Sequence, residues 1–220
     1  MKKKVYLVRH GEQLKGINDP GLSPLGKRQA EATAFFLASI GPFAGIYIST
    51  KRRTSETAAP IIARYPNVTP TFTDDLVERK IIMGNYTDQS GKFDEAQFQA
   101  DWDRASRERD WAPDGGESAI ACGERIDSVL QSLPESDRPY LVFTHGGAIK
   151  DALENQLSLE KINRFRFVEG NGQRPKGYQH CSITTITLEG QKYSLERVAS
   201  IGHLEGIGMG EGGRSPGERR

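Results

Sequence analysis

The sequence has 220 residues and a mass of 24.4 kDa, which is enough for one domain with a sizeable core. Its formal net charge is +1, with 30 Lys and Arg residues against 29 Asp and Glu residues. This balance gives no global reason to expect a nucleic acid or a membrane surface as a partner, so any attraction for anions must be local.

The N-terminal residues do not have the features of a signal peptide. Three lysines at 2–4 precede an apolar run, 5–8, that is too short for a signal sequence or a membrane span. Cys122 and Cys181 lie far apart without the spacing of metal ligands, so we expect reduced thiols rather than a disulfide or a zinc site. These features predict a cytoplasmic protein.

The first predicted element is a buried strand over 5–8 that ends abruptly at Arg9, His10 and Gly11. A strand end with a purely structural role needs neither a guanidinium nor an imidazole. In open α/β sheets ligands bind at the carboxyl ends of the strands, so these residues are candidates for a functional site.

Helical and strand patterns then alternate along the chain. Ser23 as N-cap and Pro24 at the first helical position begin the first helix, which Gly41-Pro42 ends. Further helices are predicted over about 51–63, from 115–118 to before Pro134, and over 148–157. Strands are predicted over 45–49, 68–72, 140–144, 165–168, 182–188 and 193–199, the last two forming a hairpin through 189–191.

Two segments do not fit this alternation. Residues 79–114 are polar with scattered aromatic side chains, and we expect an excursion, helical from 93 to 109, that acts as a lid over the site. Residues 202–220 contain seven glycines and almost no large apolar side chain, which predicts a flexible tail. We therefore expect a single domain over residues 1–201.

The alternation predicts an α/β fold, a three-layer α/β/α sandwich around a mostly parallel sheet of about six strands with a C-terminal antiparallel hairpin. In such a sheet the carboxyl ends of the parallel strands share one edge. This edge gathers the candidate site residues, which are Arg9, His10, Arg53, Glu78 and His145.

These side chains suit phosphoryl transfer. A guanidinium presents a planar fork of donors to phosphate oxygens, so Arg9 and Arg53 can hold the group and stabilise charge in the transition state. A neutral imidazole is a competent nucleophile, and nearby guanidiniums lower its pKa, which suits His10. Glu78 can protonate a leaving group and then activate water. The helix N-termini at Gly146 and near residue 50 would add backbone donors.

Arg9-His10-Gly11-Glu12, after an apolar strand, resembles the opening signature of the histidine phosphatase (phosphoglycerate mutase-like) superfamily. Other segments resemble later elements of that family, in the family's order: Leu22-Ser23, with Gly26 and Gln29-Ala30; Ser49, Arg53, Glu56 and Thr57-Ala58; Leu76 and Glu78; Gly115-Gly116-Glu117-Ser118; Val142 to Gly147; and His180-Cys181-Ser182-Ile183, with His in place of the family's Asn.

The resemblance implies that His10 is the phosphorylated residue, that Arg9, Arg53 and His145 bind and stabilise the phosphoryl group, and that Glu78 is the proton donor. It implies neither a metal nor a cofactor. For substrate binding we expect Arg9, Gly11, Ser23, Arg53 and Gly146. Gln13 and Gly16 stand where the family often has Thr and Asn.

The sequence therefore predicts a phosphatase that hydrolyses a phosphomonoester, either a small metabolite or a phosphoprotein. Two alternatives remain: phosphoryl transfer of the phosphoglycerate mutase type, and a catalytically weak phosphoprotein-binding module. Glu117 is the next candidate acid after Glu78, whereas we interpret His180 and His203 as structural or surface residues. The substrate and the oligomeric state, a homodimer included, stay open.

Overall fold

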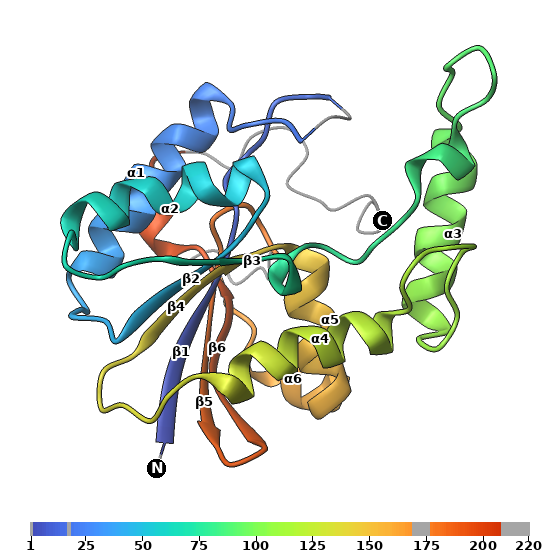
Figure 1. Cartoon of the computed structure of the whole chain (residues 1–220). Coiled ribbons are helices and arrows are strands. Elements are labelled where there is room, and N and C mark those ends of the chain that lie inside the picture. Colours follow the sequence, from blue (N-terminus) through green and yellow to red (C-terminus); the bar gives the residue numbers. More distant parts are fainter. Residues whose placement is uncertain (1, 17–18, 169–176, 208–220) are drawn as a thin grey trace.

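The computed structural model describes residues 2–16, 19–168 and 177–207. These residues form a six-stranded sheet with helices on both faces (Figure 1). The strands are β1 (Lys2–Arg9), β2 (Gly45–Ser49), β3 (Thr71–Thr73), β4 (Tyr140–Thr144), β5 (Ile183–Glu189) and β6 (Lys192–Ser200). Their order in the sheet is β3-β2-β4-β1-β5-β6. The predicted three-layer α/β/α fold is confirmed.

The sheet is parallel over its first four strands and antiparallel at its C-terminal end. β4 pairs in parallel with both β1 and β2, and β3 pairs in parallel with β2. β5 is antiparallel to both β1 and β6. The β5–β6 hairpin turns at Gly190, whose φ of 56° is a left-handed conformation that favours glycine. The predicted mostly parallel sheet with a C-terminal hairpin is therefore confirmed.

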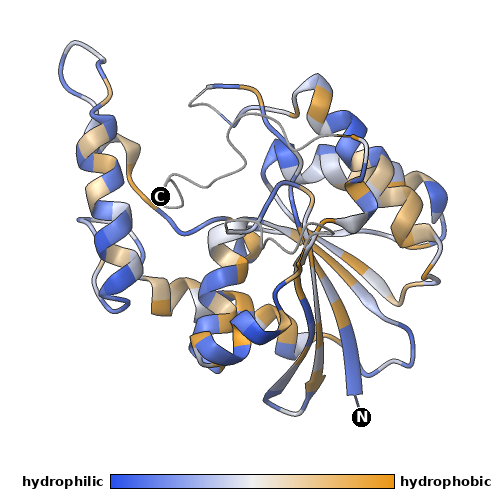
Figure 2. Ribbon diagram, turned by 180° about the vertical axis from the view of Figure 1, so that it is seen from behind, coloured by the Kyte–Doolittle hydropathy of each residue, from blue (hydrophilic) through white to orange (hydrophobic). Residues whose placement is uncertain are grey.

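Alternating side chains of the strands build two cores, one on each face. The helices are α1 (Pro24–Ala38), α2 (Arg52–Arg64), α3 (Glu95–Arg107), α4 (Ala119–Ser132), α5 (Gly146–Gln156) and α6 (Leu159–Phe165). Val5 and Leu7 of β1 belong to the core that α4, α5 and α6 cover, whereas Val8 belongs to the core that α1 and α2 cover. Figure 2 shows the apolar strands, in orange, between these helices.

Serine side chains cap the N-termini of three of these helices. The side chain of Ser23 accepts a hydrogen bond from the backbone N–H of Gly26 at 3.0 Å, and Pro24 is the first residue of α1. Ser118 caps α4 in the same way, and Ser158 caps α6. The first of these caps was predicted, and it brings the start of α1 close to the loop after β1.

The strand predicted over 68–72 begins later than expected, since β3 spans Thr71–Thr73. The backbone N–H of Val68 donates to Tyr65 at 2.9 Å in a turn that follows α2. Pro70 has no N–H to add to a strand ladder. The prediction of a third strand is correct, but its first residues belong to the turn.

The strand predicted over 165–168 is wrong. Phe165 is the last residue of α6, and Arg166 makes only an isolated bridge to Val198. The physical reason lies at Ser158, whose side chain accepts from the backbone N–H of Lys161 and begins a short helix.

The excursion after residue 79 is partly helical, as predicted. It contains the 3-10 helix η2 (Met83–Tyr86) and α3, and it stands beside α4 and α5 rather than within the layers (Figure 1). Tyr86, Phe98 and Trp102 form a small apolar cluster of their own. The excursion is therefore held together by its own aromatic side chains.

The packed body extends beyond the predicted boundary at residue 201. A 3-10 helix, η3 (Gly202–Leu204), follows β6, and Leu204 is buried against Cys181 and Ile201. The remainder of the predicted tail, from 208 to 220, lies outside the described residues. Within the described ranges, no helix has the length and apolar character needed to span a membrane.

Candidate active site

The two histidines of the predicted site meet at one edge of the sheet. His10 directly follows β1 and His145 directly follows β4, and these two strands are parallel neighbours. Their rings lie 5.2 Å apart between centroids, with 61° between the ring planes. The two histidines lie close together, as expected from the strand order, although 134 residues lie between them in the sequence.

His10 is buried and its ring is oriented by its own loop. Nδ1 lies 2.8 Å from the carbonyl oxygen of Gly11, which can only accept, so Nδ1 carries the proton. This tautomer leaves the lone pair on Nε2. Burial lowers the pKa of His10 well below its usual value, and the charges of Arg53 and then Arg9 lower it further. The imidazole is therefore neutral at physiological pH.

His145 carries its proton on the other nitrogen. Arg53 donates from Nη2 to Nδ1 of His145 at 3.0 Å, so Nε2 holds the hydrogen and donates to the Ser49 hydroxyl at 2.9 Å. Burial lowers the pKa of His145 well below its usual value, followed by the charges of Arg53 and Arg9. The two imidazoles are thus both neutral and are held as opposite tautomers.

Two guanidiniums flank these rings. Arg9, the last residue of β1, is buried and donates to the backbone carbonyl of Tyr178. Arg53, the second residue of α2, contacts His145, whereas its neighbour Arg52 pairs with Glu56 at the surface at 2.7 Å. The structure therefore brings Arg53, and not Arg52, to the histidines.

Glu78 lies on the loop after the 3-10 helix η1 (Asp74–Leu76), and this loop is fixed to the strand edge. The hydroxyl of Thr144, at the end of β4, donates to the carbonyl of Leu76 at 2.6 Å. The Glu78 carboxylate accepts from the backbone N–H of Gly147 at 3.1 Å, in the first turn of α5. A Cβ at position 147 would lie 2.5 Å from this carboxylate, so a larger residue there would displace the carboxylate from this position.

Glu78 is also close to the cations of the site. Its negative charge raises the pKa of Arg53, although burial has the larger effect and the net pKa of Arg53 is lowered. Glu78 therefore lies within electrostatic reach of the guanidinium that contacts His145.

Glu117, the other candidate acid, is bound in an ion pair. Arg125 donates to its two carboxylate oxygens at 2.9 and 2.7 Å, and the backbone N–H of Lys80 donates to it at 3.2 Å. Burial raises the pKa of Glu117, but the hydrogen bonds and charge of Arg125 outweigh burial, and the net pKa is lowered. A proton donor needs the opposite shift, which argues against Glu117 as the acid.

The residues expected to bind substrate occupy different environments. Gly11 donates from its backbone N–H to Thr57 at 2.9 Å, and Gly146 is the first residue of α5. The Ser23 hydroxyl caps α1 and donates to Glu12 at 2.7 Å, so its hydrogen is used within the protein. Substrate contacts by these residues stay predictions.

The N-terminus of α2, which we expected to donate to an anion, is engaged by a carboxylate of the protein itself. The backbone N–H of Arg52 lies 3.0 and 3.2 Å from the two carboxylate oxygens of Asp19. Asp19 Oδ1 also lies 3.7 Å from Nη1 of Arg53. Asp19 therefore occupies the anion position at the start of this helix.

Sequence reasoning missed His180, which the structure places beside the nucleophile candidate. Its ring is 5.6 Å from the ring of His10, and the residue is only 5 % exposed. The position of His180 follows from the direction of β5. Because β5 is antiparallel to β1, it starts at the edge of the sheet where β1 ends. The other histidine interpreted as structural, His203, pairs with Thr33 at 3.0 Å and stacks on Phe36.

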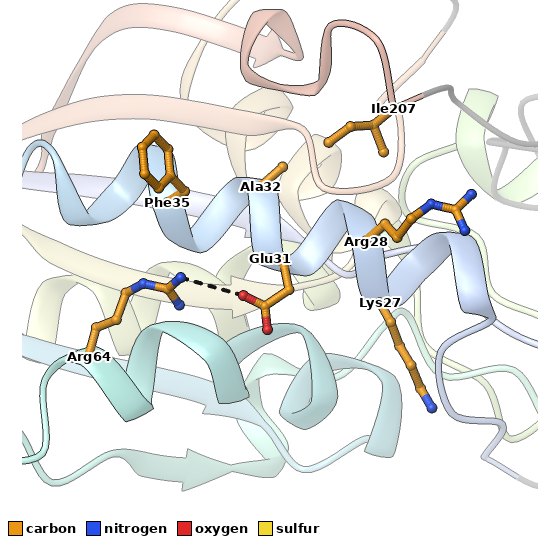
Figure 3. A pocket seen from close by; sticks show the side chains of 7 residues that line it. All are labelled: Lys27, Arg28, Glu31, Ala32, Phe35, Arg64 and Ile207. Atoms are coloured by element: carbon orange, nitrogen blue, oxygen red, sulfur yellow. Dashed lines mark hydrogen bonds and ion pairs between the residues drawn. The ribbon is translucent and has the colours of Figure 1, made fainter.

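A separate shallow pocket of about 530 Å³ lies along α1 (Figure 3). An ion pair of 3.5 Å between Arg64 and Glu31 crosses it. Its lining residues are Lys27, Arg28, Glu31, Ala32, Phe35, Arg64 and Ile207. None of the predicted site residues lines this pocket. Among the described residues, no group of three or more His, Cys, Asp or Glu side chains is arranged to hold a metal ion.

The α/β fold thus brings two histidines and two arginines to one edge of the sheet. The chain belongs to the histidine phosphatase superfamily (branch 1), which matches residues 5–201. The recognition made from the sequence motifs is therefore confirmed.

Two curated relatives illustrate the range of the family. Phosphoglycerate mutase-like protein 4 of Arabidopsis thaliana is 25 % identical over 223 residues, covering 96 % of this chain and 90 % of the relative. Glucosyl-3-phosphoglycerate phosphatase of Mycolicibacterium vanbaalenii is 30 % identical over 165 residues, covering 67 % of this chain and 71 % of the relative.

Solved structures agree on the fold. The mycobacterial glucosyl-3-phosphoglycerate phosphatase superposes with a TM-score of 0.66 at 22 % identity, covering 91 % of this chain and 100 % of the other. Phosphoserine phosphatase of Entamoeba histolytica, in complex with 3-phosphoglyceric acid, gives a TM-score of 0.65 at 20 % identity, covering 92 % of this chain and 99 % of the other. At these identities the likeness concerns the fold alone.

Proposed function

We propose that this protein is a phosphatase that hydrolyses a phosphomonoester through a phosphohistidine intermediate on His10, without a metal ion. The observation that carries the proposal is the state of His10. Its ring is neutral and oriented by Gly11 so that the Nε2 lone pair is free to attack, and Arg9 and Arg53 supply positive charge beside it.

In the first step Nε2 of His10 attacks phosphorus, and the bond between phosphorus and the leaving oxygen breaks. Protonated Glu78 gives its proton to that oxygen, which departs as the alcohol. In the second step water attacks the phosphohistidine, the P–N bond breaks, and Glu78 takes the proton that the water loses. Inorganic phosphate leaves, and His10 and Glu78 return to their starting states.

Arg9, Arg53 and His145 stabilise the charge on the transferring group. Nε of Arg53 is buried and has no hydrogen-bond partner among the described residues, so it is available to a phosphoryl oxygen. His145 is held by Ser49 and Arg53 as a fixed neutral side chain beside His10. The two guanidiniums offer several donors to a group that carries negative charge on three oxygens, whereas the one N–H of His145 must exchange Ser49 for a phosphoryl oxygen in order to donate to it.

Two relatives whose names state a phosphatase activity support hydrolysis, whereas a third is named phosphoglycerate mutase-like. A relative at 30 % identity is named a phosphatase of glucosyl-3-phosphoglycerate, which favours a small phosphorylated metabolite as substrate. A phosphoprotein substrate stays open, since another relative, from Caenorhabditis briggsae, is named a serine/threonine-protein phosphatase. A binding module would not need an oriented nucleophile.

The test is hydrolysis of p-nitrophenyl phosphate in the presence of a chelator. We expect the wild type to retain its activity and His10→Ala to lose it, with a phosphate-labelled histidine trapped in acid-free quench only in the wild type. Thermal unfolding of both proteins checks that the variant is folded. Activity that the chelator abolishes, or that His10→Ala retains, contradicts the proposed mechanism.

Mutase chemistry is tested separately. The protein is incubated with 3-phosphoglycerate and its bisphosphorylated primer, and phosphate release is compared with formation of the other isomer. We expect release of phosphate to be faster. Faster isomer formation overturns the choice of hydrolysis and leaves the phosphohistidine intermediate intact.

A further inference from the structure

A third imidazole lies at the proposed phosphoryl site. The rings of His180 and His10 are 5.6 Å apart between centroids, with 44° between their planes. His180 lies in the short segment before β5, which starts at the edge of the sheet where β1 ends. The nucleophile candidate therefore has His145 on one neighbouring strand end and His180 on the other.

The backbone holds His180 firmly in this place. Cys181 donates from its N–H to the carbonyl of His10 at 3.1 Å, and Arg9 donates from its N–H to the carbonyl of Ser182 at 3.1 Å. Cys181 has a φ of 55°, a left-handed conformation that is uncommon for a residue with a side chain. Such a conformation persists where surrounding contacts enforce it, and such positions cluster at functional sites.

One ring nitrogen of His180 has no use within the described part of the protein. Nδ1 is buried and has no hydrogen-bond partner among the described residues. A buried polar atom without a partner destabilises the fold, and native structures contain few of them. A ring that served only to fill space would avoid this cost if it were phenylalanine. The unused ring nitrogen therefore points to a partner that arrives with the substrate.

We propose that His180 is a further catalytic residue, whose imidazole N–H donates a hydrogen bond to the phosphoryl group while that group is transferred to and from His10. This inference rests on the proposed phosphatase function. A phosphoryl oxygen accepts hydrogen bonds only, so it matches the one N–H of a neutral imidazole.

The charge state of His180 suits this role. Burial lowers its pKa, and the positive charge of Arg9 lowers it further, so the ring stays neutral. Arg9 and Arg53 already supply two positive charges at the site. A neutral donor adds a hydrogen bond to the transferring group without the repulsion that a third cation would bring.

The test compares His180→Phe, which keeps a ring but has no N–H, with His180→Asn, which keeps an N–H donor. We expect His180→Phe to lower kcat by roughly 10- to 1,000-fold, as for the loss of one transition-state donor. KM should change little, and inhibition by orthovanadate should weaken in parallel with kcat. His180→Asn should recover most of the lost activity. Equal kcat and equal vanadate inhibition in His180→Phe and wild type overturn the inference.

A second measurement uses the wild-type protein, so it does not depend on folding of the Phe variant. In protein labelled with ¹⁵N-histidine, orthovanadate should shift one imidazole N–H resonance that is missing in His180→Asn. An unshifted His180 resonance overturns the inference. His10→Ala is measured in the same assays: activity that survives in this variant refutes the proposed function, whereas its loss beside an unimpaired His180→Phe refutes only the role of His180.

Discussion

Arg79 and Asp151 form a two-point ion pair that is closed to solvent. Nε and Nη2 of Arg79 donate to the two carboxylate oxygens of Asp151 at 2.8 and 2.9 Å, and the side chains are 1 % and 0 % exposed. Burial lowers the pKa of Arg79, but the Asp151 carboxylate outweighs it, and the net pKa is raised. The pair joins the residue after Glu78 to α5, whose first turn holds the Glu78 carboxylate.

We expect Arg79→Ala to destabilise the fold by about 3 kcal/mol, because it removes both hydrogen bonds to the buried Asp151 carboxylate and leaves the more distant Arg109, at 3.8 Å, as its ion-pair partner. The matched control is Glu108→Ala, which removes an exposed ion pair with Arg104 at 2.9 Å and should cost less than about 1 kcal/mol. Urea unfolding at pH 7.5 measures both. Similar costs for the two variants would show that the buried pair adds nothing beyond a surface contact.

Gly147→Ala should lower kcat while leaving the fold intact. A Cβ at this position would lie 2.5 Å from Oε1 of Glu78, so the carboxylate must move from its place at the start of α5. Gly84→Ala is the control, since a Cβ there meets no atom within 4 Å. Turnover of p-nitrophenyl phosphate and thermal unfolding are compared for the two variants. An unchanged kcat in Gly147→Ala would mean that Glu78 acts from another position or does not act.

Glu78→Gln and Glu117→Gln should separate the two candidate acids. The first should reduce kcat by roughly 100-fold or more, the range of a general acid–base group, with little effect on inhibition by phosphate. The second breaks the fork with Arg125 and should act mainly on stability. The measurement is kcat beside urea unfolding for each variant. A larger loss of kcat in Glu117→Gln reverses the assignment.

Stability should fall as the pH drops below about 6.5. Burial lowers the pKa of all four histidines of the chain, His10, His145, His180 and His203, the last to about 4. In this window the unfolded chain binds protons that the folded chain does not, so the free energy of unfolding falls with falling pH.

Asp151 acts in the opposite sense, because burial raises its pKa to about 6 although Arg79 lowers it. The net uptake of protons on unfolding therefore rises as the pH falls and approaches three near pH 5.5, at about 1.4 kcal/mol per pH unit for each proton. Urea unfolding at pH 7.5, 6.5 and 5.5 measures the slope, and His180→Asn should reduce it. A stability that is constant over this range would contradict the burial of the histidines as neutral groups.

Trp102→Ala should loosen the excursion more than the sheet. Trp102 packs with Phe98 and Tyr86, and the Arg79 guanidinium lies 4.7 Å from the centre of its ring. We expect faster proteolysis within 82–114 and a smaller change in global unfolding. Limited proteolysis with mapped cleavage sites provides the measurement. Cleavage that is unchanged within this range would show that the aromatic cluster does not hold the excursion.

The sequence was sufficient to predict which residues lie together wherever a strand is followed by a helix. His10 and His145 could be placed together because parallel strands with helical connections must share an edge, and that rule needs no knowledge of side-chain packing. The position of His180 beside His10 was not predicted. It depends on the direction in which β5 pairs with β1, which the pattern of apolar residues does not specify. Phe165 was predicted in a strand because a short apolar run fits a strand or a helix equally well. In the structure the cap at Ser158 begins a helix that includes Phe165.

Asp19 is not among the proposed catalytic groups, but it places a negative charge beside one of them. Its carboxylate lies 3.7 Å from Arg53 and accepts the backbone N–H of Arg52 at 3.0 Å. The cation that we propose to bind phosphate therefore already has a counter-ion supplied by the protein. Under the proposed function, substrate capture is an exchange of one anion for another, and selectivity depends on how readily a phosphate displaces the Asp19 carboxylate.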